Sequence, residues 1–213
     1  EVQIRQLQEL LGYHKELNER RQTILKSIEE QGKLTAELRA RIESCRQKTV
    51  LEDLYLPYKP KRRTKATIAR ERGLEPLAEL LLAATGVVDP LQLAAPFVDA
   101  GQELVDSASA LAGAGHILAE GFAEDADARA LVRDLTWQQG DFCSQPARGK
   151  EGTVSKYEMY YDFREPLRQV PSHRMLAMRR GEKEELLRLS IAAPEEEILQ
   201  RLANRHPIVN KVL

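Results

Sequence analysis

Residues 17–45 read LNERRQTILKSIEEQGKLTAELRARIESC, and this stretch decides the fold at the start of the chain. Its apolar residues recur at the spacing of one helix face, with charged and polar residues between them. Gly32 predicts the end of a first helix, because glycine adopts the left-handed conformation without strain, and Thr35 is a suitable N-cap for a second. Two helices joined by so short a break predict an antiparallel hairpin. Its apolar positions are Ile4, Leu7, Leu11, Leu17, Ile24, Leu25, Ile28, Leu38, Ile42 and Cys45.

The composition is that of a globular protein. Of the 213 residues 42% are hydrophobic, and 32 Lys and Arg against 33 Asp and Glu give a net charge of -1. The apolar content excludes general disorder, and the balanced charge means that nucleic-acid binding would require local clustering of cations. No apolar run approaches the roughly 20 residues of a membrane span, and no signal segment is present. Cys45 and Cys143 are far apart in the sequence, so we expect reduced thiols in a cytoplasmic protein.

The rest of the chain is predicted to be multihelical. Glycine and proline residues divide it into segments, most of which have a helical apolar pattern. Helices are expected at 67–72, 77–84, 102–120, 125–139, 173–180 and from 195 onward, with a loop at 144–152 and a strand within 185–191. Gly181 is expected to end the helix at 173–180. Trp137 is expected to anchor the core, because a large aromatic side chain buries much apolar area.

These patterns predict an all-α fold, in which a helical hairpin packs on a multihelical body with at most a short strand near 185–191. We expect three parts: the hairpin at 1–50, a body at 51–193 that contains a basic loop, and the start of a connecting helix at 194–213. Because the chain begins without methionine and inside a helical pattern, we also expect it to be a piece of a longer protein.

The sequence predicts no catalytic, cofactor or metal site, and we expect the chain not to be an enzyme. Its histidines never stand at metal-ligand spacing, and it lacks both a phosphate-binding Gly-x-x-x-x-Gly-Lys-Ser/Thr motif and a dinucleotide-binding Gly-x-Gly-x-x-Gly motif after a strand. An acidic cluster could suggest a metal-dependent nuclease, but we interpret it as a solvated helix face with a helix cap. The histidines are His14, His116, His173 and His206, and the acidic residues are Glu120, Glu124, Asp125 and Asp127.

One segment concentrates positive charge. Five cations fall within seven residues: Lys59, Lys61, Arg62, Arg63 and Lys65. Pro57 and Pro60 favour an extended backbone, on which cations can follow the phosphates of a nucleic acid, and Tyr55 and Tyr58 could offer a face on which unpaired bases stack. Five phosphate contacts would make log K fall against log salt with a slope of about -3.5 on a single strand and about -4.5 on a duplex. The alternative is a solvated loop whose cations pair with acidic helices elsewhere in the chain.

A second pattern overlaps the basic segment. Residues 68–74 have the small-residue and glycine spacing of the turn in a helix-turn-helix motif. Pro76, however, falls where the second helix of that motif should begin, and the same pattern suits any tight corner between helices. We therefore interpret residues 68–74 as a helix–helix corner.

Several stretches resemble the N-terminal region of the Tex family of bacterial transcription accessory proteins. The stretches are Leu51–Ala66 (LEDLYLPYKPKRRTKA), Ile68-Ala69, Gly73–Leu77 (GLEPL), Tyr161–Pro166 (YDFREP), Val170–Arg174 (VPSHR) and Arg180–Glu182 (RGE). The resemblance runs along most of the chain and is weakest at about 88–115.

The resemblance implies a multihelical, cytoplasmic, nucleic-acid-binding factor that acts around transcription, related to a eukaryotic elongation factor that works with RNA polymerase and histones. Members of the family continue into an RNase-H-like domain, generally regarded as lacking a working active site, then helix-hairpin-helix repeats and a C-terminal OB-fold RNA-binding domain. We therefore expect this chain to be an N-terminal fragment.

Two functions of different classes are consistent with the sequence. In the first, the cations at 59–65, together with Tyr58, bind RNA or single-stranded nucleic acid, or DNA, without a cofactor or metal. In the second, the chain is a helical scaffold that organises the downstream RNA-binding domains or docks on RNA polymerase, and its basic loop meets an acidic protein surface.

Overall fold

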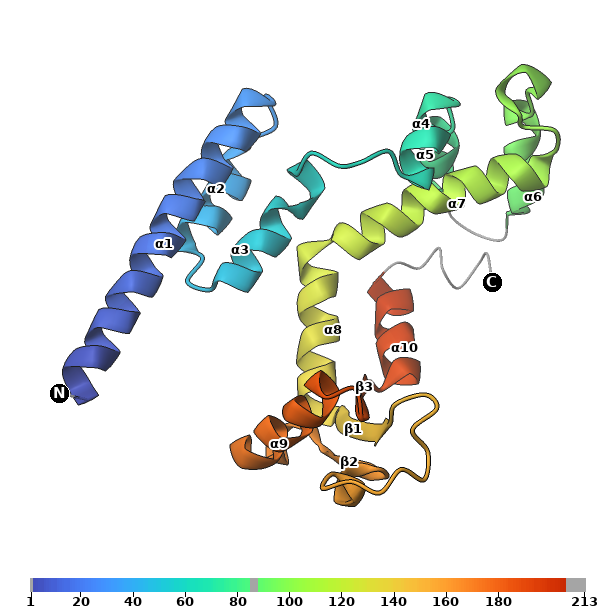
Figure 1. The fold of residues 1–213 in the computed structure, drawn as a ribbon. Coiled ribbons are helices and arrows are strands. Elements are labelled where there is room, and N and C mark those ends of the chain that lie inside the picture. The colour runs from blue at the N-terminus through green and yellow to red at the C-terminus, as the bar shows by residue number, and fades with distance from the viewer. Residues whose placement is uncertain (1, 85–87, 206–213) are drawn as a thin grey trace. The chain divides into compact units, whose positions relative to one another are not determined.

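The protein is helical in most of the residues that the structure describes. The computed structural model describes residues 2–84 and 88–205, and Figure 1 shows its elements along the chain. The expectation of a mainly helical chain is therefore confirmed. The described chain divides into two compact units, of which the first ends at Arg129 and the second begins at Ala130. None of the helices within these ranges is long and apolar enough to cross a membrane.

The division between the two units falls within one helix, α8 (Ala126–Gln139). It does not coincide with the boundaries expected after residues 50 and 193. The hairpin expected at 1–50 is part of the first unit, and the body expected at 51–193 is divided between both. Of the connecting helix expected at 194–213, the structure describes α10 (Glu195–Arg205), and the remaining residues lie outside the described ranges.

The first unit begins with the predicted helical hairpin, which consists of α1 (Val2–Glu30) and α2 (Ala36–Ser44). A third helix, α3 (Lys48–Tyr55), follows the hairpin and shares its core. Gly32 has a φ of 68°, in the left-handed region, and follows the last turn of α1. The Thr35 hydroxyl accepts a hydrogen bond from the backbone N–H of Leu38 and so caps α2 as predicted. The first core consists of Leu17, Ile24, Leu25, Ile28, Ile42, Cys45, Leu51, Leu54 and Tyr55.

Only the second half of α1 contributes to this core. Its buried residues begin at Leu17, although the apolar pattern of the helix begins much earlier. The apolar residues of the first half are exposed: Val2, Ile4, Leu7, Leu10 and Leu11. The apolar stripe of α1 is therefore longer than the surface that α2 and α3 cover.

The remainder of the first unit is built on a long helix. Its elements are η1 (Leu56–Tyr58), α4 (Lys65–Glu71), α5 (Glu75–Ala83), α6 (Pro90–Ala94), η2 (Ala95–Phe97), η3 (Ala100–Gln102) and α7 (Ser107–Glu124). Both α4 and α5 pack against α7. They meet at the tight corner predicted from residues 68–74, where Gly73 has a φ of 76° and Leu74 is buried.

The long helix α7 begins and ends later than expected. Asp106 and Ser109 form a capping box, in which each side chain bonds the other residue's backbone N–H, and this fixes the start at Ser107. The sequence pattern placed the start near residue 102, which lies in η3. Gly113 and Gly115 lie inside α7 without interrupting it.

The second unit contains a small sheet, a buried core, the larger part of α8 and two further α-helices. Its elements are the C-terminal part of α8, β1 (Asp141–Pro146), η4 (Glu158–Tyr160), β2 (Phe163–Pro166), η5 (Leu167–Gln169), α9 (Ser172–Lys183), β3 (Leu187–Ala192) and α10. The strands are antiparallel in the order β2-β1-β3, with Cys143 opposite Arg164 on one side and Ser190 on the other. The core of this unit consists of Phe142, Tyr157, Met178 and Leu187.

The sheet is larger than the sequence predicted. The strand expected within 185–191 is present as β3, and it pairs with β1. The last residues of β1 had been expected to belong to the loop at 144–152. β1 also pairs with β2 on its other side. The central strand β1 buries Phe142 and the polar Ser144, so its apolar alternation is weak. Pairing of strands far apart in the sequence stabilises it, and a local pattern does not report such pairing.

Trp137 does not anchor the core, and this expectation was wrong. Trp137 is 55% exposed, whereas Leu135 on the same helix is 3% exposed. Two positions along an α-helix correspond to a rotation of about 200°. The face of α8 that buries Leu135 therefore directs Trp137 away from the packed side.

We predict that the two ends of α1 respond differently to the same substitution. Ile24→Ala removes a fully buried side chain and should lower the free energy of unfolding of the first unit by about 2–5 kcal/mol. Ile4→Ala, at a residue that is 62% exposed, should change it by no more than about 0.5 kcal/mol. Urea unfolding followed by circular dichroism measures both, and equal effects would contradict the assignment of the core.

A second prediction concerns Gly181, which lies inside α9 and does not end it as expected. A Cβ at this position would lie 2.6 Å from Leu187 Cδ1 and 3.2 Å from Tyr157 Cδ1. Gly181→Ala should therefore destabilise the second unit by about 1–2 kcal/mol, because overpacking of the core outweighs the gain in helix propensity.

Gly115→Ala is the matched control for Gly181→Ala. No heavy atom lies within 4 Å of a Cβ added at Gly115, so this substitution in α7 should be neutral or stabilising. The chain has one tryptophan, Trp137 in the second unit, and its fluorescence during unfolding reports on Gly181→Ala directly. Unchanged stability of Gly181→Ala would show that Leu187 moves aside at no cost.

Candidate nucleic-acid interface

The candidate interface is the basic loop, residues 59–65, which joins η1 to α4. Its backbone is extended at both ends: Lys59 has φ -68° and ψ 131°, and Thr64 has φ -104° and ψ 170°. The Thr64 hydroxyl accepts a hydrogen bond from the backbone N–H of Thr67 and caps α4. The two ends of the loop are thus extended as expected, but Pro57 lies within the 3-10 helix η1, where the expectation of an extended backbone was wrong.

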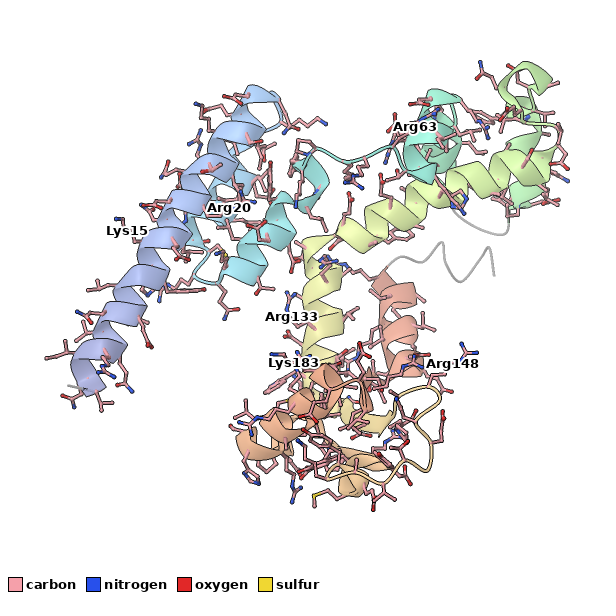
Figure 2. All side chains as sticks on the ribbon, viewed as in Figure 1. Lys15, Arg20, Arg63, Arg133, Arg148 and Lys183 are labelled. Atoms are coloured by element: carbon pink, nitrogen blue, oxygen red, sulfur yellow. The ribbon has the colours of Figure 1, made fainter. Side chains whose placement is uncertain are left out.

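Two of the five predicted cations are paired with carboxylates. Lys61 Nζ lies 2.5 Å from a Glu124 carboxylate oxygen and 3.5 Å from one of Glu120, both on α7. Arg63 lies beside α4, where its guanidinium Nη2 is 2.6 Å from Glu71 Oε2 (Figure 2). For these two cations the structure follows the alternative interpretation, in which the loop pairs with acidic side chains of the same chain.

The other three cations, Lys59, Arg62 and Lys65, are exposed. Within the described parts of the chain, none of their side chains makes a hydrogen bond or an ion pair. Two hydrogen bonds from Arg20 hold the Glu52 carboxylate and lower its pKa, and the charge of Lys59 adds a smaller lowering. Three positive charges of the loop are therefore available to an external anion, and they lie at every third residue.

The tyrosines next to the loop are less available than the sequence suggested. Tyr55 is 8% exposed and belongs to the first core, its hydroxyl lies 3.1 Å from that of Ser27, and the Arg20 guanidinium lies 5.3 Å from its ring centre. Figure 2 shows Arg20 on α1 on the side of this helix that meets α3. The expectation that Tyr55 offers a stacking face was wrong. Tyr58 is half-buried against the same core, and its carbonyl oxygen accepts a hydrogen bond from Gln31.

Glu120 is the residue that ties the loop to α7. Its carboxylate accepts hydrogen bonds from the Thr64 hydroxyl at 2.9 Å and from Arg70 Nη1 at 2.7 Å. Burial by itself raises the pKa of Glu120, whose side chain is 12% exposed. The hydrogen bonds from Arg70 and Thr64, with the charge of Lys61, have a larger combined effect, and the pKa of Glu120 lies below its ordinary value.

Sequence reasoning did not find this role of the acidic cluster. It assigned Glu120 and Glu124 to a solvated face, but their side chains are only 12% and 16% exposed and face the loop. The expected helix cap is confirmed: Asp125 accepts hydrogen bonds from the backbone N–H groups of Asp127 and Ala128 at the start of α8. Within residues 2–84 and 88–205, no group of three His, Cys, Asp or Glu side chains is placed to hold a metal ion.

Four basic residues that lie further along the chain are paired as well. Arg70 and Arg72 follow the loop, and they bond Glu120 and Glu103 respectively. In the second unit Arg164 pairs with Asp141 and Arg174 with Glu165. The unpaired cations of the loop thus differ from these neighbours in having their charge free for another molecule.

The chain has clear relatives among known proteins. Residues 86–212 match the family described as Tex central region-like. The transcriptional accessory protein Tex of Neisseria gonorrhoeae is 50% identical over 191 residues, which are 90% of this chain and 25% of that protein. Protein YhgF of Escherichia coli (strain K12) is 51% identical over 193 residues, which are 91% of this chain and 25% of that protein. The human S1 RNA-binding domain-containing protein 1 is more distant, with 29% identity over 196 residues, 88% of this chain and 19% of that protein.

The chain spans about a quarter of the length of these bacterial relatives. The family match covers more than half of the chain, including the second unit and the long helix that carries Glu120 and Glu124. The motifs at 161–166, 170–174 and 180–182, on which the resemblance partly rested, lie inside the matched range. The family resemblance is thereby confirmed, and the chain belongs to the Tex family.

Proposed function

We propose that this chain is a non-catalytic, nucleic-acid-binding part of a cytoplasmic transcription accessory factor, and that its basic loop binds the phosphates of RNA or DNA. The observation that carries the proposal is the exposed, unpaired state of Lys59, Arg62 and Lys65 on an extended backbone. The names of two relatives support it: one is called a transcriptional accessory protein and another an S1 RNA-binding domain-containing protein.

The ion pairs within the loop reduce the number of cations that are available to bind phosphates. Three available cations, instead of five, give a slope of log K against log salt of about -2.1 on a single strand and about -2.7 on a duplex. A segment with so few contacts binds weakly by itself. In the intact protein, this chain would therefore bind together with RNA-binding domains, and it would add its phosphate contacts to theirs.

A second candidate function is a helical scaffold that organises downstream RNA-binding domains or docks on RNA polymerase. The exposed apolar half of α1 favours it: Leu7 is 59% exposed and Leu11 63% exposed, together with three further apolar neighbours. Contiguous apolar surface of this kind marks an interaction with another protein surface more often than with a polyanion. Under this function, the salt dependence of nucleic-acid binding would not involve the basic loop.

We predict that Lys59→Gln, Arg62→Gln and Lys65→Gln together abolish the salt-dependent binding of the 213-residue chain to single-stranded RNA. The slope of log K against log salt should change from about -2.1 to near zero, because the counterion release that drives binding is lost. Fluorescence anisotropy of a labelled RNA strand over a series of salt concentrations measures the slope.

A matched control for this prediction is the triple variant Arg5→Gln, Lys15→Gln and Lys33→Gln. It removes the same numbers of arginine and lysine from exposed positions in and directly after α1, and Figure 2 shows Lys15 on α1. This control should keep the slope of the unmodified chain. Equal losses in both triple variants would show that net charge and not the loop determines binding, and an unchanged slope in the loop variant would favour the scaffold.

The presentation of the three cations depends on the anchoring of the loop. Glu120 holds Thr64 and Arg70, and with Glu124 it holds Lys61. These contacts fix the C-terminal end of the loop to α7, so the backbone between Lys59 and Lys65 has few alternative conformations. An anchored loop loses less conformational entropy on binding than a free one.

We predict a pH-dependent stabilisation by Glu120. Because its pKa is lower in the folded than in the unfolded chain, its contribution is complete above the ordinary pKa of 4.5 and is lost as the pH falls through the lowered value. Glu120→Gln should therefore destabilise the first unit by about 1–3 kcal/mol at neutral pH, since it weakens hydrogen bonds to charged groups.

The difference in stability between the unmodified chain and Glu120→Gln should shrink when both are measured by urea unfolding below pH 4.5. Glu79→Gln, an exposed glutamate on α5, serves as the control and should have little effect at either pH. A difference that stays constant as the pH falls would contradict the role assigned to the charge of Glu120.

A further inference from the structure

A groove between α4 and α7, the α4–α7 groove, lies next to the basic loop. Its volume is about 340 Å³, at the lower end of the range for small-ligand sites. The groove lies entirely within the first unit, and no part of the chain that the structure describes fills it.

The lining of the groove combines an apolar base with positive charge. Ile68, Ala69 and Leu74 come from α4 and the corner after it, and Ala112 and Gly113 come from α7. A Cβ at Gly113 would collide with Leu74, so glycine lets the corner approach α7 closely. The base of the groove therefore consists of small and aliphatic groups, of which Ile68, Ala112 and Gly113 are accessible while Ala69 and Leu74 lie beneath them. An aromatic ring can pack on accessible apolar groups of this kind.

The polar lining residues favour an anion. Lys65 is exposed and without an ion pair among the described residues, so its charge is available to an anion in the groove. Arg72 also lines the groove, but its guanidinium is paired with Glu103, and His116 adds an imidazole that can form a hydrogen bond. None of the lining residues is acidic, although acidic residues are abundant elsewhere in the chain. The charge of the groove is thus complementary to a ligand that joins a flat ring to a phosphate.

Lys65 connects the groove to the basic loop, because it is both the last residue of the loop and part of the groove lining. A strand whose phosphates follow Lys59, Arg62 and Lys65 would therefore reach the groove at its end. Bases in a duplex are paired and stacked, so only an unpaired strand can deliver a base into such a groove.

We propose that the α4–α7 groove receives one base of an unpaired nucleic-acid strand, with the phosphate of that nucleotide at Lys65. This inference rests on the proposed function, since it requires the basic loop to contact the same strand. It assigns to the groove the contact with bases that the sequence pattern predicted for Tyr55 and Tyr58, of which the first is buried in the first core and the second is half-buried against it.

The test compares two single strands with the same number of phosphates. One is an oligothymidylate about 12 nucleotides long, and the other is an abasic deoxyribose-phosphate strand of equal length. The unmodified 213-residue chain should bind the strand with bases roughly tenfold more tightly, as expected for one stacked base. Fluorescence anisotropy at a fixed low salt concentration measures both affinities.

The variant Ala112→Leu fills the groove from an exposed position on α7 and keeps a residue with good helix propensity. It should reduce the tenfold preference to near unity while affinity for the abasic strand stays unchanged. Ala119→Leu places the same side chain at an exposed position of α7 outside the groove, and it should keep the preference. The retained affinity for the abasic strand also shows that Ala112→Leu is folded.

The possible outcomes separate this inference from the proposed function. Equal affinities of the unmodified chain for the two strands, with the salt slope intact, would overturn the groove and leave phosphate binding by the loop. A tenfold preference that Ala112→Leu does not change would also overturn it, because the base would then bind elsewhere. Absence of binding to either strand would overturn both.

Discussion

A single carboxylate, that of Glu120, determines how the first unit presents its positive charge. It receives hydrogen bonds from Thr64 at the end of the basic loop and from Arg70 in α4, and Lys61 lies 3.5 Å away. A carboxylate that is so little exposed is stabilised only while these donors remain in place. The same contacts that satisfy Glu120 therefore join α4 and the end of the loop to α7, and they use Lys61 and Arg70 but not Lys59, Arg62 or Lys65.

The paired cations of the loop differ in how readily they could change partners. Arg63 and Glu71 are both largely exposed, and an ion pair of this kind contributes little to stability, so a phosphate could replace Glu71 at small cost. Lys61 lies between two carboxylates whose side chains are mostly buried, and its removal would leave Glu124 without its ion pair, while Glu120 would keep its contacts with Arg70 and Thr64. Exchange of a carboxylate partner for a phosphate would thus cost less for Arg63 than for Lys61.

Local patterns in the sequence predicted the elements that have local causes. Gly32 and Thr35 determine the turn of the first hairpin, and Asp125 caps α8, as their positions in the sequence indicated. The pairing of β1 with β2 and β3, and the contact of Lys61 with Glu124, join residues far apart in the sequence. Charge counting identified the loop, but it could not tell which cations are neutralised, because that depends on the packing of α4 against α7.

The helix α1 carries one apolar stripe along its length, yet only the residues from Leu17 onward are buried. If the stripe served only the first core, positions 7 and 11 would be exposed to water without a partner, and polar side chains there would be more favourable than Leu7 and Leu11. Exposed apolar side chains grouped on one face are typical of a surface that another protein segment covers. Phosphate binding by the loop and docking by α1 use different residues and different forces, so a single chain can have both functions, and high salt would weaken the first while leaving the second intact.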